Sequence, residues 1–130
     1  MRFRLDREHG AASAQVVLVT PVLLLGIMLV FQFAMYEHAS HVVTAAAQHG
    51  AAAAQAERGS EAAGRRGAQA FLGAAGSGLL GAPEVSVSRS AERTRVVVRA
   101  AVVSLVPGFA FTVTGVADGP SERWRAPSER

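Results

Sequence analysis

The most pronounced feature of the chain is a long apolar stretch near its N-terminus. From Ala11 to Met35 no side chain is ionisable. As a helix, these roughly 25 residues would be about 38 Å long, more than the hydrocarbon core of a bilayer at about 30 Å. A helix that is apolar on every face gains little in a water-soluble domain, where only one stripe meets the core. In lipid its backbone groups are satisfied internally, so the pattern predicts a transmembrane helix.

The helical pattern continues beyond this apolar stretch. Tyr36 to Arg58 is rich in alanine and contains no proline, so we expect the helix to extend out of the membrane. Tyr36 and His38 suit the outer headgroup region. The extension carries a shallow apolar stripe at helical spacing, which needs a packing partner because it buries little area per residue. The stripe consists of Val42, Ala45, Ala46, Ala53 and Ala56.

A second, shorter helix is predicted after this extension. Gly59 is expected to end the first helix, and Ser60 to cap a helix from Glu61 to Ala75. Three glycines reduce the helix propensity of this segment: Gly64, Gly67 and Gly73. A glycine-rich connection follows at residues 76–83, with no phosphate-binding glycine pattern.

From Glu84 onward the period changes from helical to two. We expect a first strand there, a polar turn at Ser90–Arg93, a stronger strand from Thr94 to Val106, and a third strand from Phe109. Pro107-Gly108 fits the centre of a type II turn. The strands would form an antiparallel meander whose apolar face covers the alanine-rich helix. The expected inward positions are Val85, Val87, Val96, Val98, Ala100, Val102, Phe109, Phe111 and Val113.

The first ten residues are polar and basic on balance. They contain Arg2, Arg4 and Arg7 against Asp6 and Glu8. Basic residues beside the first apolar segment favour a cytoplasmic N-terminus, so the rest of the chain is expected to be translocated. The alternative is a cleaved signal peptide, whose apolar region is about 7–15 residues long and ends in small residues. The longer stretch here leads into Met35–His38, a poor cleavage site, and favours a retained anchor.

Composition limits the possible functions. The chain has 130 residues, a net charge of +3, and neither cysteine nor lysine. The lack of cysteine excludes disulfides, thiolate zinc sites and cysteine nucleophiles. A strong nucleic-acid binder would usually show a denser basic patch. About 100 residues lie outside the anchor, enough for one small module.

The polar residues form no recognisable catalytic or metal-binding motif. His38 and His41 are one helical turn apart with Glu37 nearby, but a third ligand is missing and His49 is two turns away. There is no G-x-S-x-G nucleophile motif. We therefore expect no enzymatic activity, cofactor, metal or small-molecule substrate.

Four arginines define a candidate arginine face on the outer side of the predicted sheet: Arg89, Arg93, Arg95 and Arg99. This face suggests an alternative function, a membrane-tethered surface binding module that contacts an anionic polymer or lipid. Glu84 and Glu92 lie nearby and no aromatic residues interleave, so a solvated face is the favoured interpretation.

The junction between the leader and the apolar stretch carries a processing-site pattern. Gly10 and Ala11 follow a short basic leader, Gln15 stands five positions after the glycine, and the long apolar helix comes next. This region resembles that of type IV prepilins. The run from Val16 to Leu25 looks like the TadE-like branch of the Tad (tight adherence) pilus system, with a weak extension of the resemblance to the C-terminal strands. The resemblance implies that a prepilin peptidase cuts between Gly10 and Ala11.

Gln15 departs from the family pattern. In the family that this region resembles, the fifth mature residue is normally glutamate, whose carboxylate pairs with the N-terminal amine of a neighbouring subunit. A buried ion pair of this kind is chiefly a registration device, because desolvation offsets much of its attraction. Glutamine accepts a hydrogen bond but cannot neutralise the ammonium. This difference favours a minor pseudopilin or a membrane-resident assembly factor over a bulk filament subunit.

Pro21 lies inside the apolar stretch. It removes one backbone hydrogen bond and is expected to kink the helix, with Thr20 able to bond back to the preceding turn. A kink tolerated in lipid is favoured over a functional hinge. Gly26 has no partner glycine four residues away, so the stretch contains no GxxxG dimer motif.

These observations together predict a TadE-like pseudopilin with an α+β, pilin-like fold. It is expected in the cell membrane as a single-pass protein with a cytoplasmic N-terminus. The expected segments are a leader (1–10), a transmembrane helix (11–35), an extracytoplasmic helix extension (36–58), an α+β module (59–117) and a flexible tail (118–130) that Trp124 pins to an apolar surface. The partners that the resemblance implies are a prepilin peptidase, sister pilin-like subunits, a membrane platform protein and a secretion ATPase acting indirectly; membrane lipid is expected, nucleic acid is not.

Overall fold

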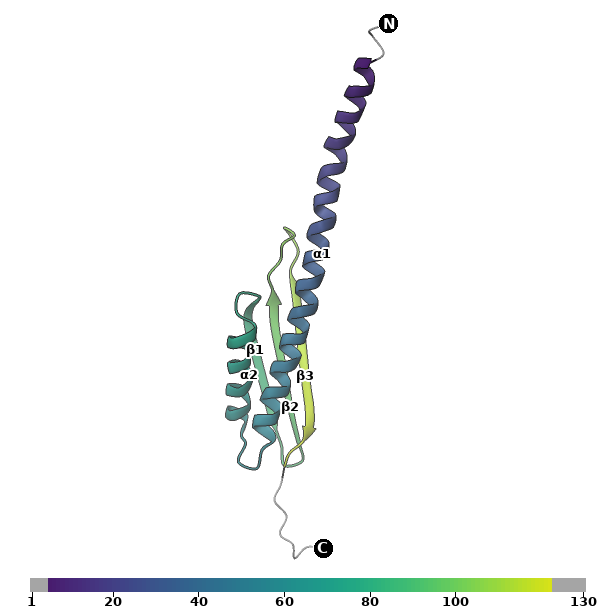
Figure 1. Ribbon diagram of the computed structural model, residues 1–130. Helices are drawn as coiled ribbons and strands as arrows, with labels where there is room; N and C mark the ends of the chain where they lie inside the picture. The colour runs from purple at the N-terminus through teal and green to yellow at the C-terminus, as the bar shows by residue number, and fades with distance from the viewer. Residues whose placement is uncertain (1–4, 123–130) are drawn as a thin grey trace, which may run out of the picture.

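The chain folds into one long helix, one short helix and a three-stranded sheet (Figure 1). The computed structural model describes the backbone of residues 5–122 and the side chains of residues 10–122. Trp124 and most of the predicted tail lie outside the described residues. The predicted α+β fold is confirmed. Its elements are α1 (Leu5–Gln55), α2 (Glu61–Ala75), β1 (Leu80–Arg89), β2 (Arg93–Val102) and β3 (Phe111–Pro120).

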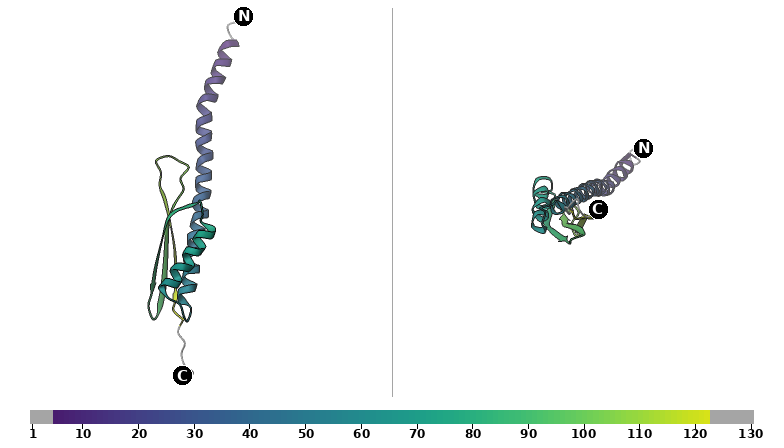
Figure 2. Two further views of the ribbon diagram at one scale, coloured as in Figure 1. Left: turned by 90° about the vertical axis from the view of Figure 1, so that its left-hand side faces the viewer. Right: turned by 90° about the horizontal axis from the view of Figure 1, so that it is seen from below.

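The two halves of α1 have different surroundings. At 1.5 Å per residue its 51 residues extend over about 76 Å, far beyond the sheet (Figures 1 and 2). The C-terminal half packs beside α2 on one face of the sheet, whereas the N-terminal half projects away from the module. The buried stripe of the C-terminal half consists of Ala39, Val42, Val43, Ala46, Ala47, Ala51 and Ala54. Ala56, which the sequence analysis assigned to this stripe, is exposed because α1 has already ended.

The sheet is an antiparallel meander in the order β1-β2-β3, as predicted. Alternate residues of β2 face the helices and are buried, while the arginines between them are exposed. Val96 at the centre lies opposite Val87 of β1 and Ala117 of β3. One face of the sheet therefore belongs to the core and the other faces outward. The buried positions of β2 are Thr94, Val96, Val98, Ala100 and Val102.

Glycines allow α1 and α2 to pack at very short range. A Cβ atom on Gly64 would lie 2.8 Å from the Cβ of Ala54 and 3.0 Å from the carbonyl oxygen of Gly50. A Cβ atom on Gly50 would likewise lie 2.9 Å from the carbonyl oxygen of Gly64. Gly64 thus lowers the helix propensity of α2, but its missing Cβ atom allows α2 to cross α1 at close range. By contrast, a Cβ atom on Gly73 would meet nothing within 4 Å.

The start of α2 follows the capping pattern read from the sequence. The Oγ of Ser60 accepts a hydrogen bond from the backbone N–H of Ala63 at 3.0 Å. This bond satisfies one of the backbone donors that a helix N-terminus leaves without an intrahelical partner. The helix then covers Glu61–Ala75, the predicted span.

Several element boundaries differ from the sequence-based expectation. α1 ends at Gln55 and not at Arg58, and β1 begins at Leu80, inside the predicted connection. β3 continues to Pro120, because residues 118–120 pair with Arg93–Arg95 of β2. The start of the predicted tail is therefore part of the sheet.

The largest difference concerns the connection between β2 and β3. β2 ends at Val102 and not at Val106, and Phe109 precedes β3 with 62% of its surface exposed. The expectation that Phe109 is buried in the core was wrong. The β2–β3 pairing closes at Val102 and Phe111, so the residues between them form a loop past the end of the paired strands. Gly108 has φ +81°, as expected for the third position of the predicted type II turn.

Candidate membrane and subunit interface

The N-terminal half of α1 is apolar and exposed on every side. From Gly10 to Phe31 each side chain is exposed, apart from a half-buried Met28. Apart from Met28, the large apolar residues between Val16 and Phe33 are 46–72% exposed. A helical surface of this size without cover is not stable in water and indicates an interaction with lipid or with other helices. By length and composition α1 is able to cross a membrane.

The predicted processing residues lie near the start of α1. Gly10, Ala11 and Gln15 are exposed, and the helix runs through them without interruption from Leu5. A Cβ atom on Gly10 would meet no other heavy atom within 4 Å. This position therefore has no packing reason to be glycine. Cleavage between Gly10 and Ala11 stays a prediction.

Pro21 lies within the continuous helix α1. The Oγ1 of Thr20 donates a hydrogen bond to the carbonyl oxygen of Val16 at 2.7 Å. This is the back-bond expected from the sequence, and it satisfies the hydroxyl in an apolar environment. The predicted kink at Pro21 stays a prediction.

Gln32 attaches the β2–β3 loop to α1, a role that the sequence analysis missed. Its side chain is 4% exposed although its neighbours Phe31 and Phe33 are exposed. Its Nε2 donates to the carbonyl oxygen of Val103 at 3.3 Å, and its Oε1 accepts from the N–H of Leu105 at 2.6 Å. The signal in the sequence was one side-chain amide within the run from Val16 to Met35, because such a group needs a hydrogen-bond partner.

An aromatic group lies beside this attachment. The rings of Tyr36 and Phe111 meet edge to face with centroids 6.4 Å apart, and Phe109 stacks on Phe111 at 6.3 Å. Gln32 and Phe111 also line an open groove of about 520 Å³ between α1 and the start of β3. The aromatic side chains are thus gathered near the end of the apolar half of α1.

The candidate arginine face is only partly formed. Arg93, Arg95 and Arg99 are exposed on the outer side of the sheet, but Arg89 lies on the inner side. The reason is the two-residue period: Arg89 follows the buried Val87 on the same face of β1. Its Nη2 donates to the carbonyl oxygen of Ala56 at 3.5 Å, just past the end of α1, where a cation is favourable.

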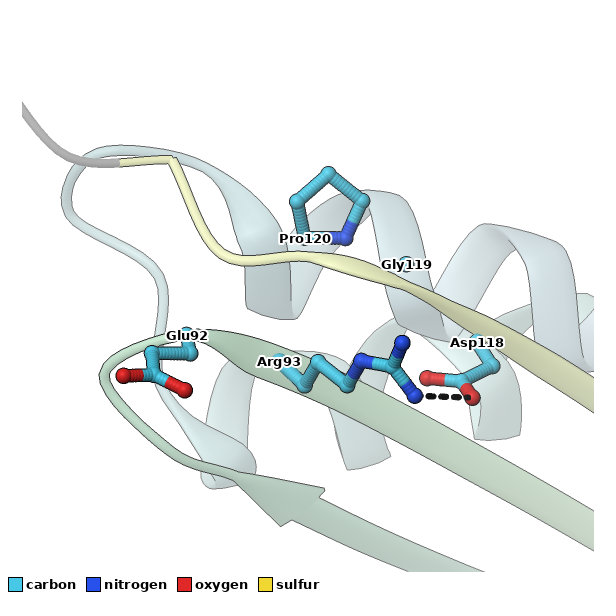
Figure 3. Close-up of a pocket in the computed structure, with 5 residues that line it drawn as sticks. All are labelled: Glu92, Arg93, Asp118, Gly119 and Pro120. Atoms are coloured by element: carbon cyan, nitrogen blue, oxygen red, sulfur yellow. Dashed lines mark ion pairs between the residues drawn. The ribbon is translucent and has the colours of Figure 1, made fainter.

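Carboxylates accompany the arginines that do face outward. Arg93 forms an ion pair with Asp118, with 3.9 Å between Nη1 and Oδ2, in a shallow surface pocket (Figure 3). Asp118 is also the cross-strand partner of Arg95, and Glu84 is that of Arg99. Opposite charges at such positions compensate one another. This arrangement is typical of a solvated surface and weakens the binding-module alternative.

The three histidines whose side chains the structure describes do not converge. His38 and His41 are exposed on α1, and His49 stacks on Phe71 of α2 with ring centroids 4.6 Å apart. Among the described residues, no group of three or more histidine, aspartate or glutamate side chains is arranged to hold a metal ion.

An exposed apolar helix joined to a small α+β module is compatible with a single-pass membrane anchor that carries a folded head. A comparison with models of known protein families adds to this description of a membrane anchor. Residues 10–52, about a third of the chain, match the family model described as TadE-like protein. The match begins at Gly10, covers most of α1, and confirms the resemblance read from the sequence. No curated protein and no solved structure gives a significant match.

Proposed function

We propose that this chain is a TadE-like minor pseudopilin, or a membrane-resident factor, that takes part in assembling a Tad pilus or a related secretion apparatus. The observation that carries the proposal is the coincidence of the family match with the uncovered apolar helix. Such a helix is stable in lipid and packs against neighbouring helices through van der Waals contacts. The chain acts by helix packing and not by catalysis.

The proposed topology places the N-terminus in the cytoplasm and the α+β module on the other side of the membrane. The basic leader supports this orientation. A prepilin peptidase then reaches the bond between Gly10 and Ala11 from the cytoplasmic side. Because α1 runs through this bond, its first turns must unwind before cleavage. Helix ends fray readily, so local unwinding near Leu5 is not prohibitive.

After cleavage the mature helix would begin at Ala11 and bring Gln15 close to its new N-terminus. Gln15 is exposed and free to accept a hydrogen bond from the N-terminal amine of a sister subunit. It cannot balance the charge of that amine, which supports a minor or assembly role over a bulk filament subunit. The proposed partners are the prepilin peptidase, sister pilin-like subunits and a membrane platform protein, with a secretion ATPase acting indirectly.

Co-expression with a prepilin peptidase tests the processing step. We expect the intact mass of the purified chain to fall by the first ten residues, and the substitution Gly10→Ala to block this loss. Gly10→Ala should not disturb the fold, because an added Cβ meets nothing within 4 Å. Gly26→Ala is the matched control: it also adds a methyl group to open space on α1 and should leave cleavage unchanged. An unchanged mass in the parent chain would contradict the processing proposal.

The binding-module alternative predicts a different set of sensitive residues. Replacing Arg93, Arg95 and Arg99 with serine removes the outward-facing arginines without touching α1. If the helix carries the function, pilus assembly in a complemented deletion strain should be close to wild type. Loss of assembly with normal protein levels would favour the arginine face.

A further inference from the structure

The β2–β3 loop, residues 103–110, exposes apolar side chains at one end of the module. Val103, Leu105 and Phe109 are all exposed, and Phe109 is the most exposed of the three at 62%. No residue from Ala100 to Ala117 carries an ionisable side chain. The loop reaches toward the N-terminal half of α1, beyond the ends of α2 and β1 (Figure 1). An uncharged apolar tip of this kind is costly in water and indicates a covering partner.

We propose that this loop inserts into the outer interfacial layer of the same bilayer that α1 crosses, with Phe109 and Leu105 in contact with lipid. The proposal rests on the membrane placement of α1 given under the proposed function. It assigns the loop a second role beside the helix: the loop fixes the height and orientation of the module on the membrane.

The depth of the loop follows from its attachment to Gln32. A hydrocarbon core of about 30 Å takes about 20 helical residues, fewer than the uncharged run of α1. If the core begins at Ala11 it ends near Val30, and if it ends at Met35 it begins near Val16. Gln32 therefore lies within about 5 Å of the outer hydrocarbon boundary in either case. Because Gln32 bonds to Val103 and Leu105, the loop is held at this depth.

The chemistry of the surrounding residues fits the same depth. Tyr36, Phe109 and Phe111 form one aromatic group, and aromatic rings are enriched at the membrane–water interface. Glu37, the first Asp, Glu, Lys or Arg residue after the apolar run, is exposed slightly farther from the membrane centre. The surface of the molecule thus changes from apolar to charged over one or two helical turns beyond Gln32.

The opposite end of the module has the opposite character. The turn between β1 and β2 and the adjoining chain carry several charged residues. These are Glu57, Arg58, Arg89, Glu92, Arg93, Asp118 and Glu122. This contrast between the two ends favours lipid over a second copy of the chain as the partner of the loop. The proposed placement of α1 already puts the loop at the surface of the bilayer.

Fluorescence quenching by brominated lipid tests this inference on the full chain. Trp124 is the single tryptophan, so Trp124→Phe gives a background into which one tryptophan is introduced at a time. The reporters are Phe109→Trp in the loop, Leu24→Trp within the apolar half of α1, and Ala91→Trp in the distal turn. Each variant is reconstituted in phosphatidylcholine vesicles whose acyl chains carry bromine at a shallow or a deep position.

We expect the loop reporter to lose most of its emission with shallow bromines and less with deep bromines. The α1 reporter should show the reverse order, and the distal reporter should lose little with either lipid. Leu105→Trp, at a second exposed position of the loop, repeats the test if the Phe109 variant does not fold.

Two further outcomes are distinguishable. If the α1 reporter is quenched but neither loop reporter is quenched more than the distal one, the loop inference is wrong and the proposed membrane anchor stands. The loop inference is also wrong if the emission of the loop reporter changes with the protein density in the vesicles but not with bromine. The loop would then contact other copies of the chain. If the α1 reporter is not quenched, the membrane anchor and the loop inference both fail.

Discussion

Replacing Gln32 with leucine should release the β2–β3 loop from α1. The substitution keeps the size of the buried side chain but removes the donor to Val103 O and the acceptor for Leu105 N–H. Each hydrogen bond contributes about 0.5–1.5 kcal/mol net, so the free energy of loop opening should fall by about 1–3 kcal/mol. At about 1.4 kcal/mol per factor of ten, the exchange protection of the Leu105 amide should decrease about 5- to 140-fold.

Hydrogen exchange of the chain in detergent or lipid measures this effect directly. The amide of Leu105 reports on the loop, while amides in the centre of β2 should keep their protection because their bonds belong to the sheet. Gln48→Leu is the matched control, since Gln48 is an exposed glutamine on the same helix. Equal protection of Leu105 in the parent chain and in Gln32→Leu would refute the view that Gln32 holds the loop.

Three further substitutions test the packing and capping of α2 by thermal unfolding of the module in detergent. Gly64→Ala places a methyl group against Ala54 and should cost about 1–3 kcal/mol; Gly73→Ala, where space is open, should instead stabilise by about 0.5–1 kcal/mol. If Gly64→Ala and Gly73→Ala change the stability in the same direction, the close approach of α1 and α2 does not restrict the size of residue 64. Ser60→Ala removes the bond to the Ala63 N–H and should cost about 1 kcal/mol. An unchanged melting temperature would mean that water replaces this cap.

Local patterns predicted much of the fold because the relevant physics is local. The period of two around Val96 indicated which face of β2 is buried, and Ser60 marked the start of α2 through its capping oxygen. Gly108 was expected in a turn because a positive φ strains other residues. The processing residues Gly10, Ala11 and Gln15 came from a family resemblance and not from such patterns.

Other features depend on contacts between distant segments. Phe109 fits the strand period, yet it lies in a loop because the β2–β3 pairing ends at Phe111. Arg89 was assigned to the outer face, but the register of β1 directs it toward the end of α1. The sequence signal of Gly64 was low helix propensity, while its role in packing depends on how α2 crosses α1.

The sequence by itself determined that a long apolar helix precedes a small sheet with one buried face, because helix and strand periods and the lack of charge are properties of neighbouring residues. Only the tertiary structure decided where the module sits along that helix. Gln32 bonds to residues more than 70 positions later in the chain. Partners so far apart in sequence are brought together by the packing of the whole module, and no local pattern records that distance.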